Sequence, residues 1–201
     1  MEIPQIHKII RNVIEQDEGG WVYTDHPNDP DQGTWAGVRF ITYKNFVTRH
    51  NASLKNLTPA DYKEIALSRP KERETIIDIY YEEYFKKCGA LYVPDSMKQA
   101  LFSHAVLTGV RKAVRSLQRA VNKDNFYPNP KLIEDGIFGE KTRKQLEKYI
   151  SEVPEITMSC IYLEQYFCHF WMQYLIHVVE SNPSYLVFLE GWFNRVERYR
   201  L

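Results

Sequence analysis

Cysteine is scarce in this chain, and the few cysteines present follow no recognisable pattern. Only Cys88, Cys160 and Cys168 occur, none of them spaced as CxxC, and the histidines are scattered along the sequence. An odd number of thiols cannot pair completely, and structural zinc sites need clustered Cys and His ligands. The sequence therefore predicts no disulfide framework, no metal site and no cofactor. Free thiols are typical of synthesis in a reducing compartment.

Net charge is absent as well, because 26 Lys and Arg residues balance 26 Asp and Glu residues. Such a chain has no overall field to attract nucleic acid or an anionic membrane. A run of basic residues between 111 and 119 is typical of a solvated helix face, with a direct ligand role as the alternative; it consists of Arg111, Lys112, Arg115 and Arg119. We therefore expect no nucleic-acid partner.

Long apolar runs are also missing. The N-terminal residues lack the apolar segment of a signal peptide, so we expect synthesis in the cytoplasm without one. The most apolar stretch, Cys160 to Val179, is interrupted by polar residues such as Glu164 and His169. We interpret it as a buried core helix and expect no membrane insertion.

Helical periodicity is what the sequence has in abundance. Segment 5–17 places Ile6, Ile10 and Val13 on one helix face, and Thr58-Pro59 is typical of a helix start. Further helices are predicted at 43–50, 71–88, from Asp95, 110–121, 139–150, 156–180 and 184–199. No β-hairpin and no internal repeat is evident. The sequence therefore predicts an all-α class, or nearly so.

Chemistry is concentrated where the first helix ends at Gly19-Gly20 and a long polar segment, 21–37, follows. A carboxylate at a helix C-terminus faces the negative end of the helix dipole, which would raise its pKa toward that of a general acid. Counting 100° per residue places Glu15 opposite the apolar face and excludes it. Periodicity does not choose between Asp17 and Glu18.

The order of short motifs resembles glycoside hydrolase family 108, which contains phage-type endolysins and bacterial proteins described as secretion activators. The opening motif comprises Glu18-Gly19-Gly20, Asp29-Pro30, Gly33-Thr34 and Gly37-Val38. Leu117-Gln118 and Asp135-Gly136 to Thr142 resemble a peptidoglycan-binding helical module, and Gly191 to Arg195 resembles the family's C-terminal motif. The resemblance implies a lysozyme-like helical fold, with a catalytic domain at 1–93 and a helical peptidoglycan-binding domain at 94–201 packed into one unit with it.

The resemblance also implies roles for individual residues. Glu18 would be the general acid, Thr34 would position water, and Asp29 or Asp25 would be the second carboxylate. Candidate substrate-binding residues are Trp21, Gly33, Trp35 and His104. The motif around Asp135 either contacts glycan or only builds a turn between helices.

The function implied is that of an N-acetylmuramidase cleaving β-1,4 bonds of peptidoglycan glycan strands at the cell wall or periplasm. A lytic transglycosylase is a variant that Asp29 and Thr34 disfavour. Ser103 and Leu107 replace an Asp and an Asn of the family pattern. They motivate the alternative, a catalytically weak or inert wall-binding protein that assists secretion. Without a signal peptide, export would depend on a holin-like pore or a secretion machine.

Overall fold

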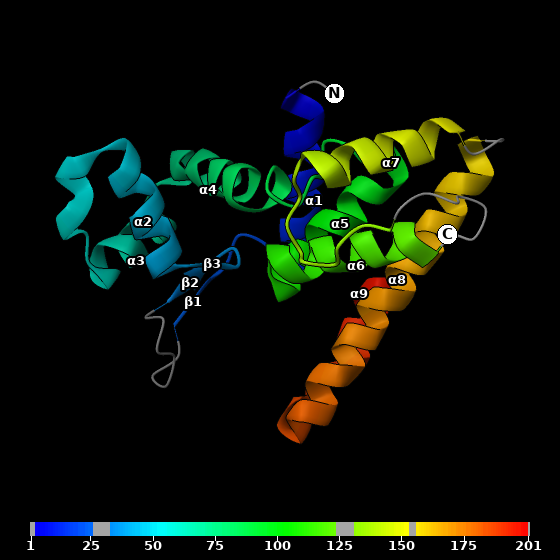
Figure 1. The fold of residues 1–201 in the computed structure, drawn as a ribbon. Coiled ribbons are helices and arrows are strands. Elements are labelled where there is room, and N and C mark those ends of the chain that lie inside the picture. The colour runs from blue at the N-terminus through cyan, green and yellow to red at the C-terminus, as the bar shows by residue number, and fades with distance from the viewer. Residues whose placement is uncertain (1–2, 26–32, 124–130, 153–155, 201) are drawn as a thin grey trace. The chain divides into compact units, whose positions relative to one another are not determined.

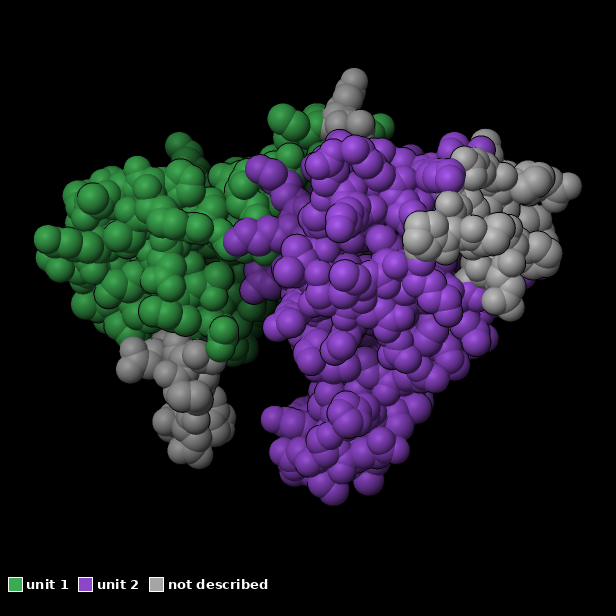
Figure 2. All heavy atoms as spheres, viewed as in Figure 1, with its two compact units in different colours: residues 1–83 green, residues 84–201 purple. Residues whose placement is uncertain are grey.

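The computed structural model describes residues 3–25, 33–123, 131–152 and 156–200. The chain divides into two compact units, Met1–Glu83 and Tyr84–Leu201, which Figure 2 colours separately. Helices dominate both units (Figure 1). The predicted helical class is therefore confirmed. Among the described residues, no helix is both long enough and apolar enough to cross a membrane.

Unit 1 begins with α1, Ile3–Asp17, whose apolar stripe is buried as predicted. The other helices of this unit are α2 (Phe40–His50), α3 (Pro59–Ser68) and α4 (Arg73–Tyr80), with short 3-10 turns at Ala52–Asn56 and Pro70–Glu72. Helix α3 begins with a capping box between Thr58 and Asp61, which satisfies two otherwise unpaired amides. A π-helical turn, Tyr81–Phe85, continues α4.

A small antiparallel sheet in unit 1 is a feature that the sequence analysis missed. Its strands are β1 (Tyr23–Thr24), β2 (Thr34–Trp35) and β3 (Val38–Arg39), in the order β1-β2-β3. Trp35 pairs with Val38, so β2 and β3 are joined by Ala36 and Gly37 alone. Both have positive φ, 49° and 78°, which is the type I′ geometry that matches the twist of a two-residue hairpin.

Two buried tyrosines attach this hairpin to the helices. Tyr62 of α3 donates a hydrogen bond to the carbonyl oxygen of Val38 at 2.8 Å, and Tyr80 of α4 donates one to that of Ala36 at 2.7 Å. Tyr62 is also surrounded by aromatic rings, among them Trp35 at 6.4 Å between centroids. The hairpin turn is therefore held in place by the aromatic core of unit 1.

The described residues of unit 2 form helices and connecting loops, without a strand. It contains α5 (Asp95–Thr108), α6 (Val110–Lys123), α7 (Glu140–Glu152), α8 (Ile156–Ser181) and α9 (Leu186–Glu197), with a 3-10 turn at Pro183–Tyr185. Helix α8 packs against α5, α6, α7 and α9. Its residues Phe167 and Trp171 are buried, as expected for a core helix.

Candidate active site

Glu18 directly follows the last residue of α1. Its amide lies 3.3 Å from the carbonyl oxygens of Val13 and Ile14, so the helical hydrogen bonding extends to this residue. Gly19 and Gly20 then turn the chain with φ of 78° and 85°, a region that glycine adopts without strain. The glycine pair therefore ends the helix at the candidate acid, as the sequence predicts.

The Glu18 side chain is half-buried and lies against the turn of the β2–β3 hairpin. A β-carbon built on Gly37 would stand 2.6 Å from Glu18 Oε2 and would also collide with the Tyr80 hydroxyl. The carboxylate and the phenol oxygen therefore flank the same small space above Gly37. Tyr80 is 1% exposed and its hydroxyl is committed to Ala36, so it forms a fixed polar wall beside the carboxylate.

Sequence reasoning did not identify Gly37 or Tyr80 as neighbours of Glu18. Tyr80 belongs to the apolar stripe of the predicted 71–88 helix, where a tyrosine is indistinguishable from an ordinary core residue. Gly37 was part of the family motif, but its proximity to the carboxylate depends on a hairpin that short strands do not announce. Both contacts become visible only in three dimensions.

Thr34 lies on the central strand of the small sheet. It pairs with Thr24 on one side and with Arg39 on the other, so these three side chains share one face of the sheet. Trp35, the next residue along β2, lies on the opposite, buried face. Thr34 is itself only partly buried, which leaves its hydroxyl on the more open face.

The two candidates for the second carboxylate differ in what the structure shows. Asp25 directly follows β1, is exposed, and has a carboxylate oxygen 3.6 Å from Nζ of Lys63 on α3. An ion pair between two such exposed groups contributes little to stability and can open readily. Asp29 lies outside the described residues.

The two candidate sugar-binding tryptophans, Trp21 and Trp35, differ in how much of each side chain is exposed. Trp35 is 1% exposed, and its ring packs against Tyr62 and Trp21. Trp21 is half-buried, and the guanidinium of Arg73 lies 5.1 Å from its ring centroid. Part of the Trp21 ring is therefore exposed to solvent, whereas Trp35 is buried and packs against Trp21. Gly33 is buried with φ of 102°, and a β-carbon there would collide with the Tyr23 hydroxyl.

His104, the remaining candidate, is fully buried in unit 2. Its Nε2 lies 3.0 Å from Ser116 Oγ and its Nδ1 lies 2.8 Å from Thr108 Oγ1. The imidazole stacks on Trp171 with ring centroids 4.6 Å apart. Burial lowers the pKa of His104 to about 3, so the ring is neutral at physiological pH. A neutral, enclosed imidazole has no surface to offer a glycan.

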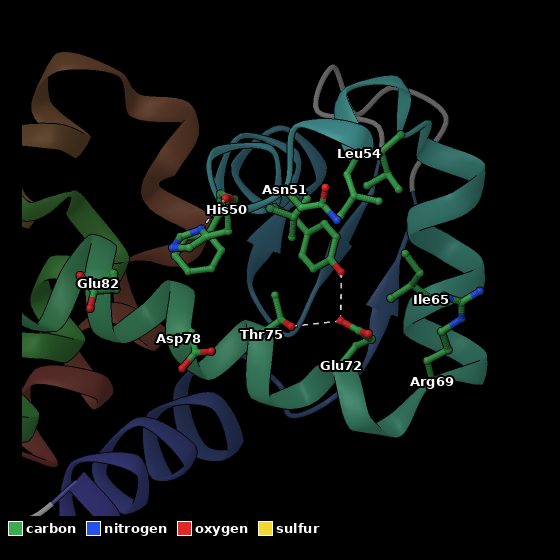
Figure 3. A pocket seen from close by; sticks show the side chains of 13 residues that line it. His50, Asn51, Leu54, Ile65, Arg69, Glu72, Thr75, Asp78 and Glu82 are labelled. Atoms are coloured by element: carbon green, nitrogen blue, oxygen red, sulfur yellow. Dashed lines mark hydrogen bonds between the residues drawn. The ribbon is translucent and has the colours of Figure 1, made fainter.

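Unit 1 also contains a separate hollow of about 610 Å³, bounded by α2, α3 and α4 (Figure 3). Glu72 lies inside it, where its Oε2 accepts hydrogen bonds from Tyr43 at 3.4 Å and from Thr75 at 3.0 Å. Asp78 lines the same hollow, and burial raises its pKa. None of the sequence-predicted site residues lines it. Among the described residues, no cluster of three metal-ligating side chains occurs.

The helical fold with an acid beside a small antiparallel sheet is that of a lysozyme-like protein. The family model of glycosyl hydrolase 108 matches residues 11–109, about half of the chain. The matched region includes Glu18, the whole sheet and α5. This match supports a glycoside hydrolase activity with a lysozyme-like role on peptidoglycan.

The structure is also similar to that of Brucella abortus SagA. The two share 26% sequence identity with a TM-score of 0.64, over 99% of this chain and 93% of the SagA chain. A comparison with curated protein sequences finds no match. The similarity to SagA extends through unit 2, which the family model covers only as far as residue 109.

Proposed function

We propose that the protein is an N-acetylmuramidase in which Glu18 protonates the glycosidic oxygen of the β-1,4 bond. The observation that carries this proposal is the position of the Glu18 carboxylate, half-buried against the hairpin turn and flanked by the Tyr80 hydroxyl. A general acid has to be held rigidly at the edge of a substrate surface. The glycine-terminated helix on one side and the anchored hairpin on the other provide that rigidity.

Thr34 and a second carboxylate complete the proposed chemistry. As the glycosidic bond breaks, positive charge develops on the sugar ring, and either water or a carboxylate attacks it. Thr34 lies on the more open face of the sheet and is proposed to orient water. Asp29 or Asp25 is proposed as the second carboxylate. A separation from Glu18 of roughly 5 Å predicts retention of anomeric configuration, and one of roughly 6.5–9.5 Å predicts inversion.

Substrate contacts are assigned by exposure. Trp21 is proposed to stack on a sugar ring, because it keeps exposed surface and its orientation is fixed by Trp35 and Arg73. Trp35 and Gly33 are proposed to act indirectly, by holding the sheet and Trp21 in place. His104 receives no substrate role, because it is enclosed in the core of unit 2.

The decisive experiment compares the wild type with Glu18→Gln on purified, insoluble peptidoglycan. The wild type is expected to release muropeptides with reducing N-acetylmuramic acid ends, identified by mass spectrometry. Glu18→Gln keeps the shape of the side chain but cannot donate the proton, so release should fall at least about 100-fold. Glu15→Gln, an exposed residue of the same helix, is the matched control and should cleave like the wild type.

Two results would contradict the proposal that the protein is a muramidase. Release by Glu18→Gln at the wild-type rate would remove Glu18 as the acid. Binding to peptidoglycan without any release by the wild type would favour the alternative, a catalytically inert wall-binding protein that assists secretion. In both cases the protein is proposed to act at the cell wall, after export by a holin-like pore or a secretion machine.

The second carboxylate is tested by Asp25→Asn and Asp29→Asn. The variant that removes the true partner should lose most cleavage, while the other should retain it. Proton NMR of the first product formed by the wild type then reports whether the anomeric configuration is retained or inverted. Full activity in both variants would show that neither aspartate takes part.

A further inference from the structure

A groove of about 460 Å³ lies between α6 and α8 in unit 2, and it has one cationic wall. Helix α6 contributes Lys112, Arg115 and Arg119, which are spaced by three and four residues and so share one helix face. Helix α8 contributes a facing row at the same spacing, consisting of Phe170, Gln173, Tyr174 and His177. The basic run that the sequence suggested as a solvated face therefore borders a concave surface.

Two of the cations are held in place by aromatic rings. Lys112 Nζ lies 5.3 Å from the ring centroid of Tyr174, and the Arg119 guanidinium lies 4.3 Å from that of Phe170. Cation–π contacts of this kind orient a charge without neutralising it. Arg119 also approaches Glu134 at 3.7 Å, but both side chains are 40% exposed, so the pair is weak.

Arg115, between these two, makes no hydrogen bond, ion pair or ring contact with any described residue. Glu134 is the one acidic side chain among the described residues that line the groove. The side chains that line the groove therefore carry a net positive charge, although the net charge of the whole chain is zero. A guanidinium presents parallel donors that match the two oxygens of a carboxylate.

We propose that this groove binds the carboxylates of the peptide stems that peptidoglycan glycan strands carry; the proposal rests on the proposed function. The cations extend over eight residues of α6, Lys112 to Arg119, about 10 Å along the helix axis. An extended peptide advances about 3.3 Å per residue, so three or four residues of a stem span the row. Short peptides with several free carboxylates fit this length and charge.

Nucleic acid fits the groove less well. Single-stranded nucleic acid is recognised by aromatic rings that are free to stack on bases. Phe170 is 8% exposed and is covered by Arg119, and Tyr174 is approached by Lys112. Each ring thus has a cation near it, which leaves less ring surface for stacking on bases. An acidic peptide needs only the row of positive charges.

The consequence for the proposed enzyme is a second point of attachment to its polymer. Contacts at Glu18 act on the glycan backbone, whereas the α6–α8 groove engages the substituents. Such a groove raises affinity for peptide-bearing strands and leaves the chemistry at Glu18 unchanged. The two sites can therefore be tested independently.

The test uses the full chain carrying Glu18→Gln, so that binding is measured without cleavage. Arg115→Gln and Lys112→Gln are each added, and sedimentation with insoluble peptidoglycan gives the affinity. Losing one charge-assisted contact should weaken binding about tenfold. Lys8→Gln, an exposed residue of α1, is the control and should bind like the parent. On glycan strands stripped of stems by an amidase, all four proteins should bind equally.

Several outcomes would overturn the proposal: no binding by the Glu18→Gln parent, unchanged affinity in Arg115→Gln and Lys112→Gln, or an equal loss on intact and stripped strands. Competition by poly(glycerol phosphate) but not by poly-glutamate would assign the groove to a phosphodiester polymer instead. Failure of the muramidase proposal appears separately, as absence of cleavage of stripped strands by the otherwise unaltered wild type.

Discussion

At the scale of single residues, Gly37 is where the geometry of the candidate acid is decided. Its φ of 78° strains any residue with a β-carbon, and the space that this carbon would occupy is already bordered by Glu18 and Tyr80. Tyr80 cannot retreat, because it is buried and bonded to Ala36. The flexible end of Glu18 would have to move instead.

We predict that Gly37→Ala lowers cleavage about 100-fold, because a carboxylate displaced by about 1 Å no longer meets the glycosidic oxygen. Stability should fall by about 1–2 kcal/mol from the positive φ and the crowding. Gly109→Ala is the matched control: φ is 91° there, but nothing lies within 4 Å of the added carbon. It should lose comparable stability and keep its activity. If both variants keep full activity, Glu18 is not positioned by this turn.

The Asp135–Thr142 turn connects single residues to a helix–turn–helix element. The sequence left two roles open for it, contact with glycan and formation of the turn. Gln118 of α6 donates hydrogen bonds from Nε2 to Asp135 Oδ1 at 2.9 Å and to Thr142 Oγ1 at 3.2 Å. Its Oε1 accepts one from the amide of Gly136 at 2.9 Å. Asp135 and Thr142 of the motif therefore both hydrogen-bond to Gln118 of α6. These bonds support a role in building the turn rather than in contacting glycan.

At the scale of elements, we predict that Gln118→Leu unfolds more easily by about 2–4 kcal/mol. The substitution preserves size but leaves several buried donors and acceptors without partners, each costing about 1–3 kcal/mol. Chemical denaturation followed by circular dichroism measures the change. Gln5→Leu, an exposed position on α1, should change the free energy of unfolding by less than about 0.5 kcal/mol. Equal stability of the two variants would mean that Gln118 does not hold the turn.

The helices were predictable from the apolar stripe of α1, from the long apolar stretch that became α8, and from the recognisable cap with which Thr58 begins α3. The sheet was not predictable. Its strands are two residues long, too short for alternation to register, and its turn places Ala36 at φ of 49°, where Asn or Gly is usual. Ala36 is fully buried, so packing has overridden the preference of the turn. The position of Glu18 followed from Gly19-Gly20, but its neighbours across the hairpin did not.

At the scale of the whole chain, the family match and the compact units divide the molecule differently. The match ends at residue 109, after α5, whereas the units divide between Glu83 and Tyr84. The family segment therefore takes in α5, whose residues His104 and Ser103 belong to the core of unit 2. Arg195 of α9 donates to Ser103 Oγ at 2.8 Å, which ties the end of the chain to this segment. Domain limits of 1–93 and 94–201 stay a prediction.

His104 makes the stability of the whole chain depend on pH. Its imidazole is buried and neutral in the folded protein, where burial lowers the pKa to about 3, while the unfolded chain titrates near its ordinary value of about 6.5. Below that value the unfolded state binds a proton that the folded state does not. The contribution of neutral His104 to folding stability is therefore fully present above about pH 6.5 and is lost as the pH falls toward 3.

We expect this one residue to cost up to about 1.4 kcal/mol for each pH unit below 6.5, or about 2 kcal/mol between pH 7 and pH 5. Urea unfolding of the wild type and of His104→Gln across this range isolates the effect, because all other groups titrate alike in both. The advantage of the wild type should shrink by that amount at the acidic end. Parallel curves for His104→Gln and the wild type would show that the imidazole takes up its proton within the folded core, which the enclosing Trp171, Ser116 and Thr108 contacts argue against.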